Sequence, residues 1–185
     1  MIYTQIFHGP LGKMIACATE QGLCLLEFVG STRIEREQQE LQRLLKRHLV
    51  AGSNSHLEQT EAELREYFVG TRRQFGIALH TPSTPFEALV WTELQQIPYG
   101  ETVSYQEQAA RIGKPSAVRA VANANGKNRV SIIIPCHRVI GADGSLTGYG
   151  GGLQRKQWLL EHEGVLKPCS GGLFDEEIYR RPETE

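Results

Sequence analysis

Apolar and polar residues in the first eighty positions form a pattern that mixes strands with helices. Ile2–Phe7, Lys13–Ala18 and Leu23–Phe28 are short apolar-rich runs separated by glycine and proline, which is typical of a strand meander. From Thr32 to Val50 apolar residues recur at helical spacing, and a second amphipathic segment covers His56–Val69. This region therefore predicts three strands followed by two helices.

The limits of these helices also have local signals. The apolar positions of the first helix are Ile34, Leu41, Leu45 and Leu49. Residues 51–55 interrupt that periodicity, and Gly70 suits the left-handed residue that ends the second helix. Residues 74–80 are predicted to form one more strand. The sequence Thr-Pro-Ser-Thr-Pro at 81–85 is typical of a linker, so we place a domain boundary there.

Beyond the linker, three helices are predicted from their caps. Thr84 and Glu87, with Pro85 between them, supply both halves of a capping box, and Ser104 and Glu107 repeat the arrangement. The second of these helices stops near Gly113, and Pro115 suits the first turn of a third that runs to about Gly126. Two short helices joined by a tight turn predict a helix-turn-helix, although ordinary helical domains contain the same pattern.

The last of these helices is slim. Arg119 and Asn123 are its main long or polar projections, because the other positions include Ala117, Ala120, Val121, Ala122 and Ala124. Such a helix either packs tightly against a neighbour or approaches nucleic acid closely. With so few side chains that could read bases, it is expected to bind backbone and shape more than sequence.

A β-branched run at 130–134 predicts a buried strand that leads into the sequence Pro-Cys-His-Arg-Val at 135–139. Cys136 has His137 beside it and lies among several cations that favour a thiolate. A strand would point these two side chains to opposite sides, so their cooperation requires a turn or an intervening water. For Cys17, Cys24 and Cys169 a structural or surface role is the preferred interpretation.

The region after the cysteine is rich in glycine. Gly141 to Gly152 surround Tyr149, which indicates either close backbone approach to a ligand or a mobile hairpin. Leu153–His162 is predicted to be a helix, and Glu163 follows it. An acidic residue opposes the helix dipole at this end. It is therefore either a solvated charge or a carboxylate held in place to orient a histidine.

Charge is unevenly distributed in this chain of 185 residues, whose net charge is −1 and whose pI is about 6.6. Residues 111–156 contain eight basic residues and one acid, Asp143, which gives +7 there and leaves −8 for the remainder. The basic stretch suits a polyanion, which the whole-chain pI would argue against. No apolar run is long enough to cross a bilayer and no secretory signal is visible, so a cytoplasmic protein with reduced thiols is expected.

Several motifs together resemble the O6-alkylguanine-DNA alkyltransferases, mainly over residues 84–164. The motifs are Ser104-Tyr105-Gln106, Ala117-Val118-Arg119-Ala120-Val121, Pro135-Cys136-His137-Arg138-Val139, Tyr149 and Trp158-Leu159-Leu160-Glu161-His162-Glu163-Gly164. A weaker likeness continues through Pro10-Leu11-Gly12 and Glu20-Gln21-Gly22-Leu23.

The resemblance implies a fold and a function. The fold is an α/β N-terminal domain with a ribonuclease H-like sheet, residues 1–80, and a mainly α, winged-helix-like domain with a helix-turn-helix, residues 86–164, joined by the linker at 81–85. The protein would flip O6-alkylguanine, and O4-alkylthymine, out of duplex DNA and transfer the alkyl group irreversibly to Cys136 in one turnover. No cofactor is implied, and the partner is double-stranded DNA bound by a monomer with little sequence specificity. Cooperative binding stays open.

The resemblance also assigns roles to residues. Cys136 would be the nucleophile, His137 would deprotonate it through a water, Glu163 would orient His137, and Asn128 would brace the turn. Tyr105 would help to rotate the nucleotide and protonate the leaving guanine, and Arg119 would fill the stack. The guanine pocket would comprise Val139, Tyr149 and Gly150. Further DNA contacts would come from Tyr105, Gln106, Ala120, Ala122 and Lys127.

Some features fall outside this resemblance. Positions 147 and 150, Thr and Gly here, vary in the family, so pocket width stays open. Cys17 and Cys24 with His8 or His80 do not have the spacing of a zinc site, and no metal is expected. The tail at 165–185, which includes Phe174 and Tyr179, matches no known pattern. The alternatives are a helix-turn-helix regulator with a structural Cys136, a Cys-His hydrolase, and a silent lesion-binding relative, which the presence of Cys136 disfavours.

Overall fold

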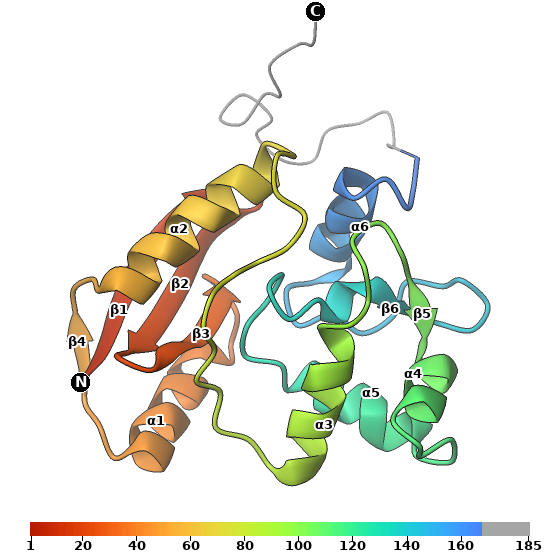
Figure 1. The fold of residues 1–185 in the computed structure, drawn as a ribbon, viewed down its shortest axis with the longest axis horizontal. Helices are drawn as coiled ribbons and strands as arrows, with labels where there is room; N and C mark the ends of the chain where they lie inside the picture. Colours follow the sequence, from red (N-terminus) through yellow and green to blue (C-terminus); the bar gives the residue numbers. More distant parts are fainter. Residues whose placement is uncertain (168–185) are drawn as a thin grey trace, which may run out of the picture. The chain divides into compact units, whose positions relative to one another are not determined.

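The computed structural model describes residues 1–167, and the chain divides into two compact units, with the sequence boundary between Pro82 and Ser83 (Figure 1). The predicted tail lies outside the described residues from position 168 onward, and so do Cys169, Phe174 and Tyr179. Among the described residues no helix is both long and apolar enough to cross a membrane.

The first unit is a four-stranded sheet with two helices. The strands β1 (Ile2–Gly9), β2 (Gly12–Thr19) and β3 (Gly22–Phe28) form the predicted antiparallel meander. A short strand β4 (Leu49–Ala51) pairs in parallel with β1, which gives the order β3-β2-β1-β4. The helix α2 (Ser55–Phe68) packs on the strands of the meander, and Gly70 follows it with a φ of 80°.

The first helix is shorter than its periodicity predicts. α1 covers Ile34–Leu45 and ends at Lys46, which is left-handed with a φ of 51°. Leu49 belongs instead to β4 and packs on the same core cluster as Leu41. The predicted helix to Val50 was wrong because a strand residue can face the same core as a preceding helix, so the apolar spacing continues past the true end.

The predicted strand at 74–80 was also wrong. Only Leu79 forms an isolated bridge, with Leu23 of β3. The backbone of Gly76 bonds to side chains of α2: its N–H donates to Glu63 Oε2 at 2.8 Å, and its carbonyl accepts from Gln59 Nε2 at 3.2 Å. Side chains of α2 therefore take the backbone groups of Gly76, and pairing with the sheet is limited to the bonds that Ala78 and His80 make with Leu23, each of 2.8 Å.

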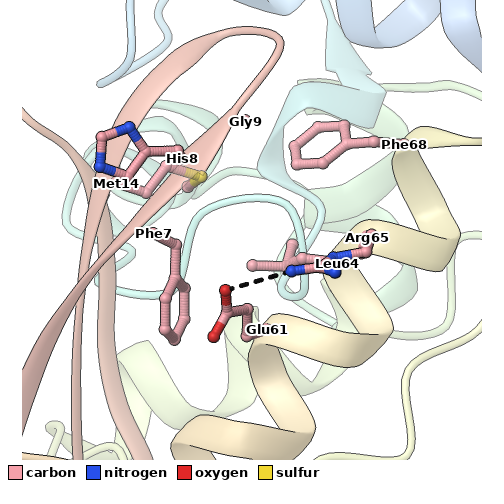
Figure 2. A pocket seen from close by; sticks show the side chains of 8 residues that line it. All are labelled: Phe7, His8, Gly9, Met14, Glu61, Leu64, Arg65 and Phe68. Carbon is pink, nitrogen blue, oxygen red and sulfur yellow. Dashed lines mark hydrogen bonds and ion pairs between the residues drawn. The ribbon is translucent and has the colours of Figure 1, made fainter. Parts of the chain in front are cut away.

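A small cavity lies between the β1–β2 hairpin and α2, lined by the eight residues labelled in Figure 2. Its volume is about 10 Å³. That is room for one water at most. The Glu61–Arg65 ion pair lies at this cavity, with both side chains largely exposed. This space is too small for an organic ligand.

The second unit is mainly helical. It contains α3 (Pro85–Leu94), α4 (Tyr105–Arg111), α5 (Val118–Gly126) and α6 (Leu153–His162), with a parallel pair of two-residue strands, β5 (Val103–Ser104) and β6 (Val139–Ile140). Both predicted capping boxes are confirmed, at Thr84 and Ser104. The third predicted helix begins at Val118, three residues later than the Pro115 signal predicts, because residues 114–117 form a turn.

Buried polar contacts fix α5 against its neighbours. The side chains of Gln108 on α4 and Asn125 on α5 exchange two hydrogen bonds of 2.7 and 3.2 Å. Trp91 Nε1 on α3 donates to the carbonyl of Ala124 at 2.9 Å. Because all of these groups are buried and satisfied, the angle and register of α5 are specified by hydrogen bonds as well as by apolar packing.

Candidate active site

The apolar run before the cysteine is a compact buried turn, and the prediction of a strand there was wrong. Ile132 has a left-handed φ of 71°, and the N–H of Ile134 donates to the carbonyl of Val130 at 3.0 Å. The β-branched composition correctly marks burial, since all five residues at 130–134 are buried. It does not reveal that the chain folds back on itself.

Asn128 holds this turn together and reaches the cysteine. Its Oδ1 accepts from the N–H of Val130 at 3.0 Å, and its Nδ2 donates to the carbonyl of Ile134 at 2.8 Å. The same Nδ2 donates to Cys136 Sγ at 3.2 Å. One carboxamide therefore closes the turn and contacts the sulfur, and a donor at this distance favours the thiolate form.

Cys136, His137 and Arg138 form one turn of 3-10 helix. Cys136 and His137 therefore lie on a turn and not on the predicted strand, and within residues 1–167 no direct hydrogen bond joins His137 Nδ1 to Cys136 Sγ. His137 is fully buried, and its Nε2 lies 2.8 Å from Glu163 Oε1. Its Nδ1 is buried without a hydrogen-bond partner among the described residues. Burial lowers the pKa of His137, so the ring is neutral, with the proton on Nε2 and a basic Nδ1.

Glu163 has four hydrogen-bond donors around its carboxylate. Besides His137, Arg138 Nε and Nη2 donate at 2.9 and 3.0 Å, and the Gly100 N–H donates at 3.2 Å. Burial alone would raise the pKa of this carboxyl, but hydrogen bonds from His137 and Arg138, together with the charge of Arg138, hold it well below its usual range. Glu163 is therefore an anion at every physiological pH and can stabilise a proton on His137.

Arg138 and Gly100 are site residues that the sequence analysis did not identify. Arg138 also donates to the carbonyl of Ile97 at 2.6 Å and lies over the ring of Tyr99. Gly100 has a φ of 80°, and a Cβ there would lie 3.1 Å from the backbone oxygen of Glu163. The glycine after Pro-Tyr was a turn signal, but nothing in the spacing connected it with a residue 63 positions later.

Lys156 is the other residue that sequence analysis missed. In the sequence it is one of the eight basic residues at 111–156. In the structure it is fully buried, and its Nζ donates to the carbonyls of Val139 at 2.6 Å and Thr147 at 2.7 Å. Burial lowers its pKa to about 8, against the opposing effect of Cys136. Lys156 thus links the strand after the cysteine turn to the glycine-rich loop.

A cavity of about 520 Å³ lies between α4, α5 and the glycine-rich loop. This volume is within the usual range of ligand sites and has room for a heterocyclic base. Tyr105 spans it: its hydroxyl donates toward the carbonyls of Thr147 at 3.2 Å and Gly148 at 3.4 Å, and burial raises its pKa. The cavity is lined by Tyr105, Val118, Arg119, Ala122, Gly126, Thr147, Gly148, Tyr149 and Gly150.

The remaining residues with predicted roles lie in different settings. Val139 is fully buried and does not line the cavity; its carbonyl binds Lys156. Gln106 and Ala120 are exposed. Lys127 is exposed, but its Nζ lies 2.8 Å from Glu87 Oε1 on α3. Arg119, by contrast, makes no ion pair or hydrogen bond through its side chain within residues 1–167 and projects into solvent beside the cavity.

The cysteines of the first unit are structural in their surroundings. Burial raises the pKa of Cys17, and Cys24 Sγ donates to the carbonyl of Cys17 at 3.1 Å. His80 Nδ1 is engaged with Thr19 Oγ1 at 2.8 Å. In the described part of the chain, no group of three or more His, Cys, Asp or Glu residues could hold a metal ion.

Comparison with known proteins gives matches over both units. The model of the 6-O-methylguanine DNA methyltransferase ribonuclease-like domain matches residues 2–81, and that of the DNA binding domain matches residues 85–165. A methylated-DNA–protein-cysteine methyltransferase of Methanosarcina acetivorans is 39% identical over 164 residues, 88% of this chain and 99% of that protein. The protein of the same name from Mycolicibacterium paratuberculosis is 55% identical over 113 residues, 61% of this chain and 68% of its own length.

A solved structure is similar in fold to this chain. Mycobacterium tuberculosis OGT in complex with DNA matches with a TM-score of 0.76 and 38% sequence identity, over 87% of this chain and 92% of that chain. The matches in sequence and in structure therefore extend over both units of this chain.

Proposed function

Because this chain belongs to the 6-O-methylguanine DNA methyltransferase family, we propose that it repairs alkylated DNA by moving the alkyl group from guanine O6 to its own Cys136. The observation that carries this assignment is the buried Cys136–His137–Glu163 arrangement, in which His137 Nδ1 has no hydrogen-bond partner within residues 1–167. The nearby cavity of about 520 Å³ supplies room for the damaged base.

Activation of the thiol begins at His137. Its Nδ1 takes the proton of the Cys136 thiol through an intervening water, and the imidazolium that forms is stabilised by the Glu163 carboxylate. Asn128 Nδ2 stays directed at the sulfur and supports the thiolate. Glu163 cannot compete for the proton, because Arg138 and His137 keep its pKa low.

The transfer step is a displacement at carbon. The Cys136 sulfur forms a bond to the alkyl carbon while the carbon–O6 bond breaks, and the electron pair of that bond leaves with the guanine. The hydroxyl of Tyr105 lines the cavity and donates the proton that neutralises the departing base. The thioether that remains cannot be hydrolysed by a nearby water, so each molecule acts once.

Delivery of the base requires the second unit to bind duplex DNA. We assign α4 and α5 as the helix-turn-helix of a winged-helix-like domain, supported by their tight turn and their buried Gln108–Asn125 contact. Arg119 is the residue that fills the stack when the nucleotide leaves it, since its guanidinium is exposed beside the cavity. Unstacking costs a few kcal/mol, which such an insertion partly offsets.

The domains have separate roles in this proposal. Residues 1–80 form a scaffold, 81–85 link it to the rest, and 86–164 bind DNA and transfer the alkyl group. The division of the structure after Pro82 and the limits of the two family models support these assignments. The unbridged thiols Cys17, Cys24 and Cys136 suit a reducing compartment, so we place the protein in the cytoplasm.

Peptide mapping tests the assignment directly. The protein is incubated with duplex DNA that carries labelled O6-methylguanine, digested, and examined by mass spectrometry. The expected result is one methyl group per molecule, on the peptide that contains Cys136, and none in the Cys136→Ser variant. Cys24→Ser is the matched control and should react normally. Label on another residue, or more than one turnover, would overturn the proposal.

A further inference from the structure

The exposed face of α5 has one polar side chain without an assigned role. Val121, Ala124 and Asn125 form the buried face of this helix. The exposed positions are Arg119, Ala120, Asn123, Gly126 and the following Lys127. At about 100° per residue, Asn123 lies at the centre of the exposed face, one turn beyond Arg119 and one turn before Lys127.

The carboxamide of Asn123 has no structural task within residues 1–167, where its side chain makes no hydrogen bond. The other polar side chains after Arg119 on this helix are engaged: Asn125 pairs with Gln108, and Lys127 pairs with Glu87. Asparagine is also a poorer helix former than alanine, which occupies several neighbouring positions. Neither packing nor helix stability therefore accounts for an asparagine here.

The position of Asn123 relative to the cavity defines what it faces. Arg119, Ala122 and Gly126 line the cavity, so the cavity lies along one side of α5. Asn123 lies between those residues in sequence but is absent from the lining, and its side chain is exposed. Asn123 therefore lies on the exposed face of α5 next to the cavity and not inside it.

We propose that Asn123 reads the base edge of a pair next to the lesion and gives the protein a preference for sequence context. This inference rests on the function proposed above. A carboxamide has a donor and an acceptor, and it recognises adenine N6 and N7 in the major groove, or donates to adenine N3 in the minor groove. The alanines around it let the backbone of α5 come close enough for so short a side chain to reach.

The expected size of the effect is modest. One or two hydrogen bonds to a base edge change the rate of repair by about 3–30-fold between the preferred and the least preferred neighbour. Such a preference leaves lesions in every context repairable, because phosphate contacts and the cavity are unaffected by the neighbouring pair.

The test measures methyl transfer from O6-methylguanine duplexes in which the pair on each side of the lesion is varied. Single-turnover rates at subsaturating protein are compared for the unmodified protein and Asn123→Ala. The unmodified protein should show the context preference, and the variant should lose it while keeping its rate with free O6-benzylguanine. Ala110→Ser, at an exposed position of α4 with no assigned role, is the matched control and should keep the preference. A preferred adenine is also replaced by its deaza analogues. The 7-deaza analogue should remove the preference if Asn123 contacts N7, and the 3-deaza analogue should remove it if Asn123 contacts N3.

Other outcomes would overturn the proposal. An equal spread of rates in both proteins, or no spread in the unmodified protein, would show that Asn123 reads nothing. A uniform loss over all contexts, with a reduced dependence on salt, would assign it to a phosphate. Insensitivity to both deaza analogues would exclude the proposed contact with adenine. A complete absence of methylated Cys136 with any duplex would instead refute the proposed function, so the two failures are distinguishable.

Discussion

Replacement of Glu163 by glutamine tests the electrostatic centre of the site. Each carboxylate oxygen accepts two hydrogen bonds: Oε1 from His137 and Arg138, and Oε2 from Arg138 and Gly100. In Glu163→Gln one oxygen becomes an NH2 group, which faces donors whichever way the amide lies. The Arg138 guanidinium also stays buried without its anion.

The burial of the Glu163–Arg138 ion pair sets the size of the expected loss in unfolding free energy. The side chain of Glu163 is fully buried and that of Arg138 is 7% exposed. Breaking a buried ion pair by removing one partner costs about 3–5 kcal/mol, a large part of the 5–15 kcal/mol that stabilises a typical domain. Unfolding in urea can be followed by tryptophan fluorescence, because Trp91 and Trp158 both lie in the second unit. Glu161→Gln is the matched control and should change stability by about 0.5 kcal/mol or less.

The difference in unfolding free energy between the unmodified protein and Glu163→Gln should depend on pH with a defined sign. Folding lowers the pKa of Glu163 below its ordinary value of 4.5, so at low pH the unfolded chain binds a proton that the folded protein does not. The contribution of the Glu163 carboxylate to the free energy of unfolding is fully present above about pH 4.5 and decreases by about 1.4 kcal/mol per pH unit below it. The gap between the two proteins should be constant from pH 8 to 5 and then narrow. A gap under about 1 kcal/mol, or one that stays constant down to pH 3, would refute the reasoning.

Two further changes probe α5, the helix that we propose to face DNA, and its buried contact with α4. Arg119→Ala should slow methyl transfer from duplex lesions by about tenfold or more while leaving the reaction with free O6-benzylguanine within about twofold, because only the duplex requires a filled stack; equal losses in both assays would contradict its role. Gln108→Leu leaves the buried Asn125 amide without its partner and should cost about 1–3 kcal/mol in urea unfolding, and adding Asn125→Leu should recover part of this loss. A double variant as unstable as the sum of both single variants would show that the two amides act independently.

Local signals predicted elements well wherever the hydrogen bonds that define them are also local. The capping boxes at Thr84 and Ser104 need only a hydroxyl and a glutamate three residues apart, and both are present in the structure. The three-stranded meander likewise follows from apolar runs separated by turn residues. In these cases the partners lie within a few residues, so the sequence contains the whole interaction.

Predictions of secondary structure failed where a tertiary contact, with a side chain or with a strand, determines the backbone conformation. The run at 130–134 has the composition of a strand, but Asn128 and the packing around it make a turn with Ile132 left-handed. Leu49 leaves the periodic helix because the edge of β1 is available to pair with it. The composition of a segment indicates that its residues are buried, but it does not indicate the backbone conformation that buries them.

For the candidate site, too, the sequence indicated some residues and only the structure indicated others. Sequence motifs identified Cys136, His137 and Glu163, and the structure brings His137 and Glu163 into contact and ties the cysteine to Asn128. The parts played by Gly100 and Arg138 were not predictable, since a carboxylate collects its donors from segments far apart in the chain.

By itself the sequence determined how much charge lies between residues 111 and 156, and which residue types accompany it. Only the tertiary structure decided which of those charges can meet DNA. Lys156 is buried against two carbonyls, Arg138 is bound to Glu163, and Lys127 is paired with Glu87. Arg119 projects from the exposed face of α5. The physical reason is that a charge acts through its distance from other charges and from water, and folding sets both.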